Sequence, residues 1–217
     1  MSMQLIYGTG NPAKIQSMKR NVQGMPLEVI GLKEAAQKTG IVLPDIEENG
    51  DTPIENARLK AEVYFKLFRQ PVFSCDSGLY LWNHKTGEML PNEEQPGIHI
   101  RGRGEVRLTD DELIERMVSL VRKYGPVRAR YQNAICLILD ENTVLESEAE
   151  NLWGEPFLFT DMPHARRQEG FPLDSISVDI KSGRYYYDME DERQDVVAAD
   201  QGFKEFFEVV INGSNFG

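Results

Sequence analysis

The spacing of apolar residues changes along this chain of 217 residues, and each spacing predicts a type of element. Short, continuous apolar runs indicate buried strands at residues 4–7, 27–32 and 71–75. Apolar side chains that return every three or four residues indicate amphipathic helices at residues 13–22, 53–68, 110–124 and 196–211. The first two strands flank the first helix, so we expect the chain to begin with a parallel β-α-β unit.

The second half of the chain is typical of antiparallel strands. Residues 128–140 predict a strand, a turn follows at Glu141 and Asn142, and residues 143–150 alternate like its half-exposed partner. Further short strands are expected at residues 154–159, 175–178 and 185–187. No internal repeat or linker is visible, which favours a single domain over residues 1–217 with two lobes.

The stretch Gln4–Lys14 joins the first strand to the first helix through a turn with two glycines. Asn11 is the expected N-cap, Pro12 suits the first helical position, and Lys14 falls in the first turn. Free backbone N–H groups and the positive end of the helix dipole would meet at this corner, which predicts an anion site. The alternative is an ordinary strand–helix corner with a surface lysine.

The acidic residues at 45–51 precede a helix that Thr52, Pro53 and Glu55 are expected to start as a capping box. Asn56 and Lys60 lie one turn apart on this helix, so both can face a ligand. Alternatively, Lys60 is a solvated lysine and the acidic stretch is a solvated loop.

Asp76 follows the apolar run at 71–75 and is itself followed by Ser77 and Gly78. Ligands of open α/β sheets bind at the ends of strands, so a carboxylate at such an end is a candidate functional group. The alternative is an Asx-turn that stops the strand.

Residues 84–107 show little apolar periodicity, which is typical of a long loop or a lid. Arg101, Arg103 and Arg107 form a basic cluster there, which could contact a substrate, although a solvated loop or a dimer contact is the simpler interpretation.

The formal net charge of −11 argues against a general nucleic-acid-binding surface, because nonspecific phosphate affinity needs a positive field. An acidic protein can still bind a nucleotide if a few cations converge or if carboxylates recruit a divalent metal. Cys75 and Cys136 lie in apolar runs and are expected to be buried thiols. Neither a signal peptide nor a membrane span is visible, so we expect a cytoplasmic protein without a membrane partner.

Three motifs occur in a specific order: T-G-N-x-x-K, E-E-x-G-D-T-x-x-E-N-A-x-x-K-A and D-S-G-L. Together with P-G-I at residues 96–98 and A-R-Y at 129–131, they give the chain a resemblance to the inosine triphosphate pyrophosphatase family. The resemblance is strong over residues 4–79, weaker to about residue 140, and poor beyond. It implies an α/β fold with a long mixed twisted β-sheet, flanking helices and two lobes around a central cleft, and it implies a homodimer.

The resemblance also implies roles for individual residues. Asp76 would be the catalytic general base, and Glu47 and Asp76 would bind Mg²⁺. Substrate contacts are implied at Thr9, Gly10, Asn11, Lys14, Asn56, Lys60, Ser77, Gly78, Phe171, Asp174 and Arg193. Hydrolysis of a phosphoanhydride consists mainly of positioning and charge neutralisation, for which lysines, Mg²⁺ and a carboxylate base are suited.

The chain departs from the family pattern at four places. Cys75 replaces a usual second acidic residue, which predicts weaker or altered metal binding. Leu173 stands where the family has a second aromatic residue, Arg193 stands in for a lysine, and residues 197–199 replace a Ser-His-Arg motif. The His and Arg of that motif make hydrogen bonds to the base, so their absence predicts a changed or relaxed base preference.

The leading hypothesis is therefore a Mg²⁺-dependent nucleoside triphosphate pyrophosphatase for inosine- or xanthosine-type bases, or for an altered base. A noncatalytic nucleotide-binding or sensing protein and a hydrolase of another phosphorylated metabolite remain as alternatives.

Overall fold

The computed structural model describes residues 2–102, 107–168, 171–189 and 198–213, and the chain divides into two compact units. The first unit comprises residues 1–77, 132–153 and 197–217. The second comprises residues 78–131 and 154–196. The predicted cleft between two lobes stays a prediction.

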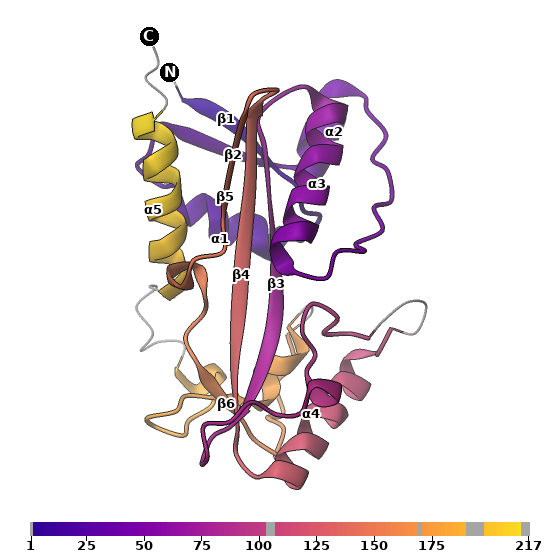
Figure 1. The fold of residues 1–217 in the computed structure, drawn as a ribbon, viewed down its shortest axis with the longest axis vertical. Coiled ribbons are helices and arrows are strands. Elements are labelled where there is room, and N and C mark those ends of the chain that lie inside the picture. The colour runs from indigo at the N-terminus through magenta and orange to yellow at the C-terminus, as the bar shows by residue number, and fades with distance from the viewer. Residues whose placement is uncertain (1, 103–106, 169–170, 190–197, 214–217) are drawn as a thin grey trace. The chain divides into compact units, whose positions relative to one another are not determined.

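The first unit begins with the predicted parallel β-α-β arrangement (Figure 1). β1 pairs in parallel with both β2 and β3. Its strands and helices are β1 (Met3–Tyr7), α1 (Pro12–Asn21), β2 (Leu27–Gly31), α2 (Leu32–Thr39), α3 (Pro53–Phe68), β5 (Thr143–Ser147), the short 3₁₀ helix η2 (Glu150–Leu152) and α5 (Ala198–Gly213).

Two long strands, β3 (Val72–Asn83) and β4 (Val127–Asp140), run through both units. The second unit adds η1 (Asn92–Glu94), α4 (Asp110–Tyr124), β6 (Phe157–Phe159), η3 (Pro172–Ile176), β7 (Ser177–Val178) and η4 (Tyr186–Met189). The described strands form a seven-stranded mixed sheet in the order β2-β1-β3-β4-β6-β7, with β5 antiparallel to β4. This confirms the predicted mixed α/β fold.

Alternation along the strands of the first unit sends side chains to two different cores. Tyr7, Phe73 and Cys75 join a core with α1 and α5. Ile6 and Val72 instead pack with α2 and α3. The two groups of helices therefore cover opposite faces of the sheet, as Figure 1 shows for this part of the chain.

The second unit has its own core, in which Leu79 and Leu81 of β3 pack with α4, the start of β4 and η3. The amphipathic pattern of residues 110–124 is confirmed, because Leu113 and Met117 are buried there. The Thr109–Glu112 capping box that starts α4 is present, as is the Thr52–Glu55 box of α3.

Several expectations about secondary structure were wrong or incomplete. The strand predicted at 175–178 is reduced to β7 at Ser177 and Val178, because residues 175 and 176 belong to η3. The strand predicted at 71–75 continues to Asn83, because Leu79 and Leu81 supply a second buried stretch beyond Asp76. The strand predicted at 27–32 ends at Gly31, and Leu32, predicted as its last residue, instead begins α2, which continues through residues 33–39 that carried no prediction. The strand predicted at 185–187 is instead a single bridge at Tyr185 followed by the 3₁₀ helix η4, whose Tyr187 is buried.

Both cysteines are buried free thiols, as predicted. None of the helices in the described residues is long and apolar enough to cross a lipid bilayer.

We predict that Gly202→Ala destabilises the first unit. A methyl group at Gly202 of α5 would lie 2.0 Å from the Asn151 carbonyl oxygen, and backbone gives way with difficulty. We expect a loss of about 1–3 kcal/mol in the free energy of unfolding, measured by denaturant titration, despite the better helix propensity of alanine. Gly213→Ala in the same helix meets no atom within 4 Å and serves as the control. Equal stability of both variants would contradict the close packing of α5 on η2.

Candidate functional site

The corner between β1 and α1 forms as predicted, with Asn11 as the N-cap and Pro12 at the start of the helix. Gly8 donates to the Phe73 carbonyl of β3 at 2.7 Å, which joins the corner to the neighbouring strand. A side chain at Gly8 would collide with the Ser74 hydroxyl, since its Cβ would lie 2.0 Å from that oxygen. The requirement for glycine at this position is thus steric.

Most of the N–H groups at this corner already have acceptors. The Asn11 carboxamide oxygen accepts from Ala13 N–H at 2.9 Å and from Lys14 N–H at 3.4 Å. The Thr9 hydroxyl accepts from Asn11 N–H at 3.2 Å. Within the described residues, the Gly10 N–H has no acceptor. An anion at this corner would therefore be bound by the Lys14 ammonium and the Gly10 N–H unless the Asn11 cap opens. The expectation of several free N–H groups at this helix terminus is corrected in this respect, because the Asn11 side chain already accepts from two of them.

On the opposite face of the sheet, Lys60 of α3 lies between two carboxylates. Its ammonium nitrogen is 3.1 Å from Asp76 Oδ1 and 3.4 Å from Glu48 Oε2. The Lys60 and Asp76 side chains are only 12% and 13% exposed, so water screens this ion pair weakly. The structure thus rejects the interpretation of Lys60 as a solvated helix lysine.

The neighbour of Lys60 in the acidic loop is Glu48, which the sequence analysis did not select. The Glu47 side chain is exposed and has no hydrogen bond or ion pair with another described residue. The two glutamates are adjacent, so the sequence offered no means of choosing between them. The role of Glu47 as a metal ligand stays a prediction.

Asn56, expected to face a ligand with Lys60, is 2% exposed and holds the acidic loop. Its carboxamide oxygen accepts from Gly50 N–H at 2.8 Å. The Glu55 carboxylate accepts from Asp51 N–H at 2.7 Å, which adds a second attachment. These bonds anchor the loop that carries Glu48 to the start of α3, and the substrate contact expected of Asn56 stays a prediction.

Cys75, next to Asp76, points to the α1 face of the sheet and contributes to the core there. Burial raises the pKa of its thiol to about 12, while a hydrogen bond with Tyr7 and the charge of Lys14 act in the opposite direction. Cys75 is therefore a neutral thiol at physiological pH, and it offers a metal neither a carboxylate nor a thiolate.

Ser77 also points away from Asp76, as successive residues of a strand must. Its hydroxyl is 2.7 Å from the carboxamide oxygen of Asn133 on β4. The sequence gave no signal for Asn133, because the pairing of β3 with β4 decides which residues meet. Gly78, the next residue, is buried beneath the Tyr80 ring, where a side chain would lie 2.8 Å from that ring.

The predicted base-recognition residues lie in or near the second unit. Phe171 precedes η3, and Asp174 lies within it. Burial raises the pKa of the Tyr131 hydroxyl, and the negative charge of Asp174 adds to this effect. Arg193 lies outside the described residues. The contacts of these residues with a base stay predictions.

The described part of residues 84–107 is more ordered than a plain loop. Gly97 and Met89 form bridges to Leu79 and Trp82 of β3. Arg101 pairs with Asp110 at 2.7 Å, which explains one member of the basic cluster as a contact within the second unit. Arg103 lies outside the described residues, and a lid function stays a prediction.

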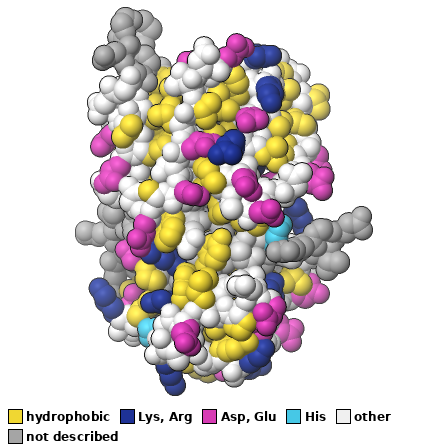
Figure 2. All heavy atoms as spheres, viewed as in Figure 1, with side chains coloured by type: hydrophobic (Ala, Val, Ile, Leu, Met, Phe, Trp, Pro, Cys, Tyr) yellow, Lys and Arg dark blue, Asp and Glu magenta, His cyan; other side chains and the backbone are white. Residues whose placement is uncertain are grey.

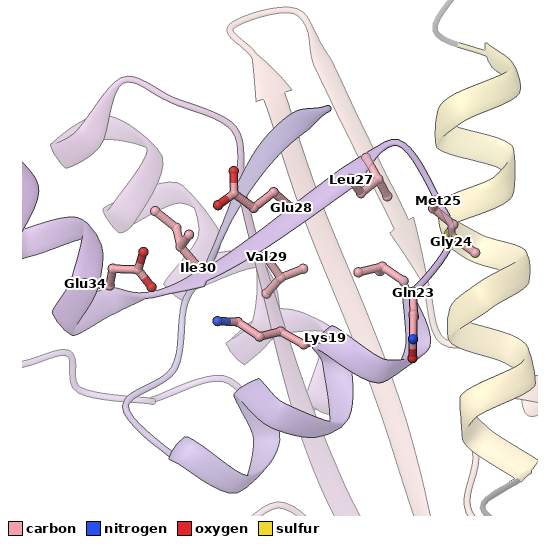
Figure 3. A pocket seen from close by; sticks show the side chains of 10 residues that line it. Lys19, Gln23, Gly24, Met25, Leu27, Glu28, Val29, Ile30 and Glu34 are labelled. Carbon is pink, nitrogen blue, oxygen red and sulfur yellow. The ribbon is translucent and has the colours of Figure 1, made fainter. Parts of the chain in front are cut away.

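A shallow hollow of about 270 Å³ lies at the edge strand β2 of the first unit (Figure 3). Lys19 extends from α1 toward β2 there, and Gln23, Glu28 and Glu34 also line the hollow. None of the candidate residues lines it, so we do not assign it to the site.

Acidic side chains are spread over the face seen in Figure 2, in keeping with the net charge.

Comparisons with known proteins agree with this fold. A model of the Ham1 family matches residues 5–198. The chain is 31% identical over 138 residues to a dITP/XTP pyrophosphatase of Porphyromonas gingivalis, covering 63% of this chain and 64% of that protein. It is 26% identical over 177 residues to a dITP/XTP pyrophosphatase of Thermoanaerobacter sp., covering 80% of this chain and 79% of that one.

Solved structures resemble the whole chain. A HAM1 protein from Coxiella burnetii matches with a TM-score of 0.68 at 20% identity, covering 98% of this chain and 100% of that one. The Ham1 protein of Staphylococcus aureus matches with a TM-score of 0.64 at 21% identity over 98% and 100% of the two chains. At this identity the likeness establishes the fold.

We predict that Asn56→Ala loosens the acidic loop. The variant leaves the half-buried Gly50 N–H without its acceptor, which should cost about 1 kcal/mol in the free energy of unfolding. Hydrogen exchange should rise at residues 47–51 more than in β1. Asn56→Asp keeps an oxygen in place for Gly50 N–H and should exchange more slowly than the alanine variant. Unchanged exchange in Asn56→Ala would contradict the anchoring role.

We predict that Cys75 resists alkylation in the folded protein. With its pKa near 12, the thiolate fraction at about pH 8 is about three orders of magnitude below that of an exposed cysteine. Labelling with iodoacetamide, followed peptide by peptide by mass spectrometry, should be slow in buffer, should accelerate as the pH rises, and should be rapid in denaturant. Rapid labelling at neutral pH would show that Cys75 is accessible and ionised.

Proposed function

Because this chain belongs to the Ham1 family, we propose that it is a nucleoside triphosphate pyrophosphatase, which converts a nucleoside triphosphate to the monophosphate and pyrophosphate. The single observation that supports this most is the placement of Lys60 between Asp76 and Glu48. A weakly exposed cation flanked by two carboxylates has the charges that such a reaction requires, and it occurs within the motifs that resemble the family.

We propose Mg²⁺ as the cofactor, and the residues present fit it. Within the described residues, no three His, Cys, Asp or Glu side chains gather as a ready metal site. Mg²⁺ does not need one, because it is commonly held by one or two carboxylates, substrate phosphates and several waters. Asp76 and Glu48 would hold it, with Glu47 as the neighbouring candidate. When bound, the ion neutralises phosphate charge and makes a coordinated water more acidic.

In the proposed reaction, Asp76 accepts a proton from a water that attacks the α-phosphorus. A new phosphorus–oxygen bond forms, the bond from the α-phosphorus to the bridging oxygen breaks, and pyrophosphate leaves with the electron pair. Lys60 supplies positive charge to the phosphates as it moves away from Asp76, and Glu48 limits how far it moves. These roles are positioning and charge neutralisation, which dominate phosphoryl transfer.

The phosphates would also meet the α1 corner. Lys14 and the Gly10 N–H supply the positive potential there, with Thr9 supporting the turn through Asn11. Opening of the Asn11 cap would release the N–H groups of Ala13 and Lys14 for phosphate oxygens.

Base recognition is proposed for the η3 region. Phe171 would stack on the base and Asp174 would accept hydrogen bonds from it, with Arg193 as a further contact. The curated relatives are named for dITP and XTP, so nucleotides with these bases are the first to test. The replaced Ser-His-Arg motif supports a broader or shifted base preference.

Cys75 favours a second candidate, a noncatalytic nucleotide-binding protein on the same fold. A neutral thiol stands where the family usually has a carboxylate, so metal binding is expected to be weaker. Nucleotide binding without release of pyrophosphate would support this candidate.

We also propose a cytoplasmic homodimer, as the resemblance implies, and light scattering in solution tests the dimer.

The test is a panel of ribo- and deoxynucleoside triphosphates, including dITP and XTP, incubated with Mg²⁺ while pyrophosphate is measured. Asp76→Asn should lower kcat by about 10²–10⁴-fold, because the carboxylate base is lost while the shape is kept. Glu34→Gln is the matched control, since Glu34 also pairs with a lysine, Lys38, but on the exposed surface. Turnover of no nucleotide, or turnover that Asp76→Asn leaves unchanged, would refute the proposal.

A further inference from the structure

Ser77, which follows Asp76 in β3 but points to the opposite face of the strand, forms a chain of hydrogen bonds with Asn133 and Leu152. Ser77 Oγ lies 2.7 Å from Asn133 Oδ1, and Asn133 Nδ2 lies 2.7 Å from the Leu152 carbonyl oxygen. Leu152 ends η2 and is 1% exposed, and its own N–H donates to Ala149. The acceptor at the far end of the chain is thus fixed in a packed part of the first unit.

This geometry determines where the protons are. A backbone carbonyl can only accept, so the NH₂ group of Asn133 must face Leu152. The carboxamide oxygen of Asn133 then faces Ser77, and that oxygen can only accept as well. Ser77 must therefore donate its single hydroxyl proton to Asn133. Its two lone pairs remain for any other partner.

A hydroxyl in this state attracts proton donors and repels a second acceptor. The oxygens of an ionised triphosphate are acceptors, so Ser77 is unsuited to bind them directly. A bound nucleotide brings two kinds of donor instead: the waters that Mg²⁺ retains and the hydroxyls of the sugar.

We propose that Ser77 accepts a hydrogen bond from such a donor, and that Asn133 is the positioning residue that keeps Ser77 an acceptor. This rests on the proposed function, since it presumes that the nucleotide bound at Asp76 also reaches the α1 corner on the other face of β3. Ser77 shares its face of β3 with Cys75, which packs in one core with Ile15 and Met18 of α1, the helix that begins at the Lys14 corner. The hydroxyl is thereby placed on the side where the phosphates are expected, so its inability to donate would affect how they bind.

Two variants separate this role from simple structural support. Ser77→Ala removes the acceptor, and Asn133→Leu keeps a similar volume while releasing the Ser77 proton. Asn151→Leu is the control, because Asn151 precedes Leu152 in η2 but bonds to Glu205 on the surface. The probe is inorganic tripolyphosphate without Mg²⁺ at about pH 8.5, above the second phosphate pKa of about 6, and binding is measured by calorimetry.

The expected effects have opposite signs. Without Mg²⁺, Asn133→Leu should bind tripolyphosphate about two- to tenfold more tightly, because Ser77 can then donate to it, and Ser77→Ala should bind it at least as well as the wild type. For the α,β-methylene analogue of inosine triphosphate with Mg²⁺, both variants should bind about two- to tenfold more weakly. In the Ser77→Ala background, Asn133→Leu should change neither affinity further.

The source of the donor follows from the same titrations. If metal-bound water donates, Ser77→Ala weakens the analogue only when Mg²⁺ is present. If a sugar hydroxyl donates, Ser77→Ala weakens the ribonucleotide with or without Mg²⁺ and leaves its 2′-deoxy or 3′-deoxy form unaffected.

Several results would overturn the proposal. Weaker tripolyphosphate binding by Ser77→Ala would mean that Ser77 donates to phosphate. If Asn133→Leu and Asn151→Leu lost affinity for both probes to the same extent, Asn133 would be only a structural support. If the affinity losses of Ser77→Ala and Asn133→Leu added up in the double variant, Asn133 would not act through Ser77. If the wild type bound neither probe, the phosphate site of the proposed function would fail as well, and that result is distinguishable because it precedes any comparison of variants.

Discussion

The ion pair between Lys60 and Asp76 is the interaction on which the candidate site depends. A carboxylate inside a covered strand is costly unless a partner compensates its charge. Lys60 supplies this partner from α3, and Glu48 shares it from the acidic loop. Because Asp76 is compensated, β3 continues through this position, and the same strand carries the core of the second unit at Leu79 and Leu81. One local pairing thus allows a charged group and a continuous strand to coexist.

Strand geometry divides the chemistry of this site between two faces. Asp76 points to α3, where the carboxylates and Lys60 gather, whereas Cys75 and Ser77 point to the face that α1 covers. The groups proposed to bind the metal and to accept the proton therefore lie on the other face of β3 from the Lys14 corner. The bonds of Asn56 to the acidic loop and of Asn133 to η2 then fix each side independently.

Local signals predicted much of the fold. The capping boxes at Thr52 and Thr109 and the apolar spacing of the helices were sufficient to place α3 and α4, because both signals act within a few residues. Contacts between distant segments were not predictable in this way. The sequence could not indicate that Asn133 meets Ser77, or that Glu48 rather than its neighbour meets Lys60. Each depends on strand pairing or on a side-chain choice with no sequence signature.

We propose, as the central claim, that a divalent ion and the triphosphate meet at Asp76 and Glu48, the two carboxylates that the Lys60 ammonium bridges. The most direct measurement is a crystal structure with Mn²⁺ and a non-hydrolysable nucleoside triphosphate, in which anomalous scattering locates the ion. We predict a peak at about 2.1–2.2 Å from an Asp76 or Glu48 oxygen, with the Lys60 ammonium moved onto a phosphate. A peak elsewhere, such as beside Glu28 and Glu34, with the Lys60–Asp76 pair intact, would contradict the claim.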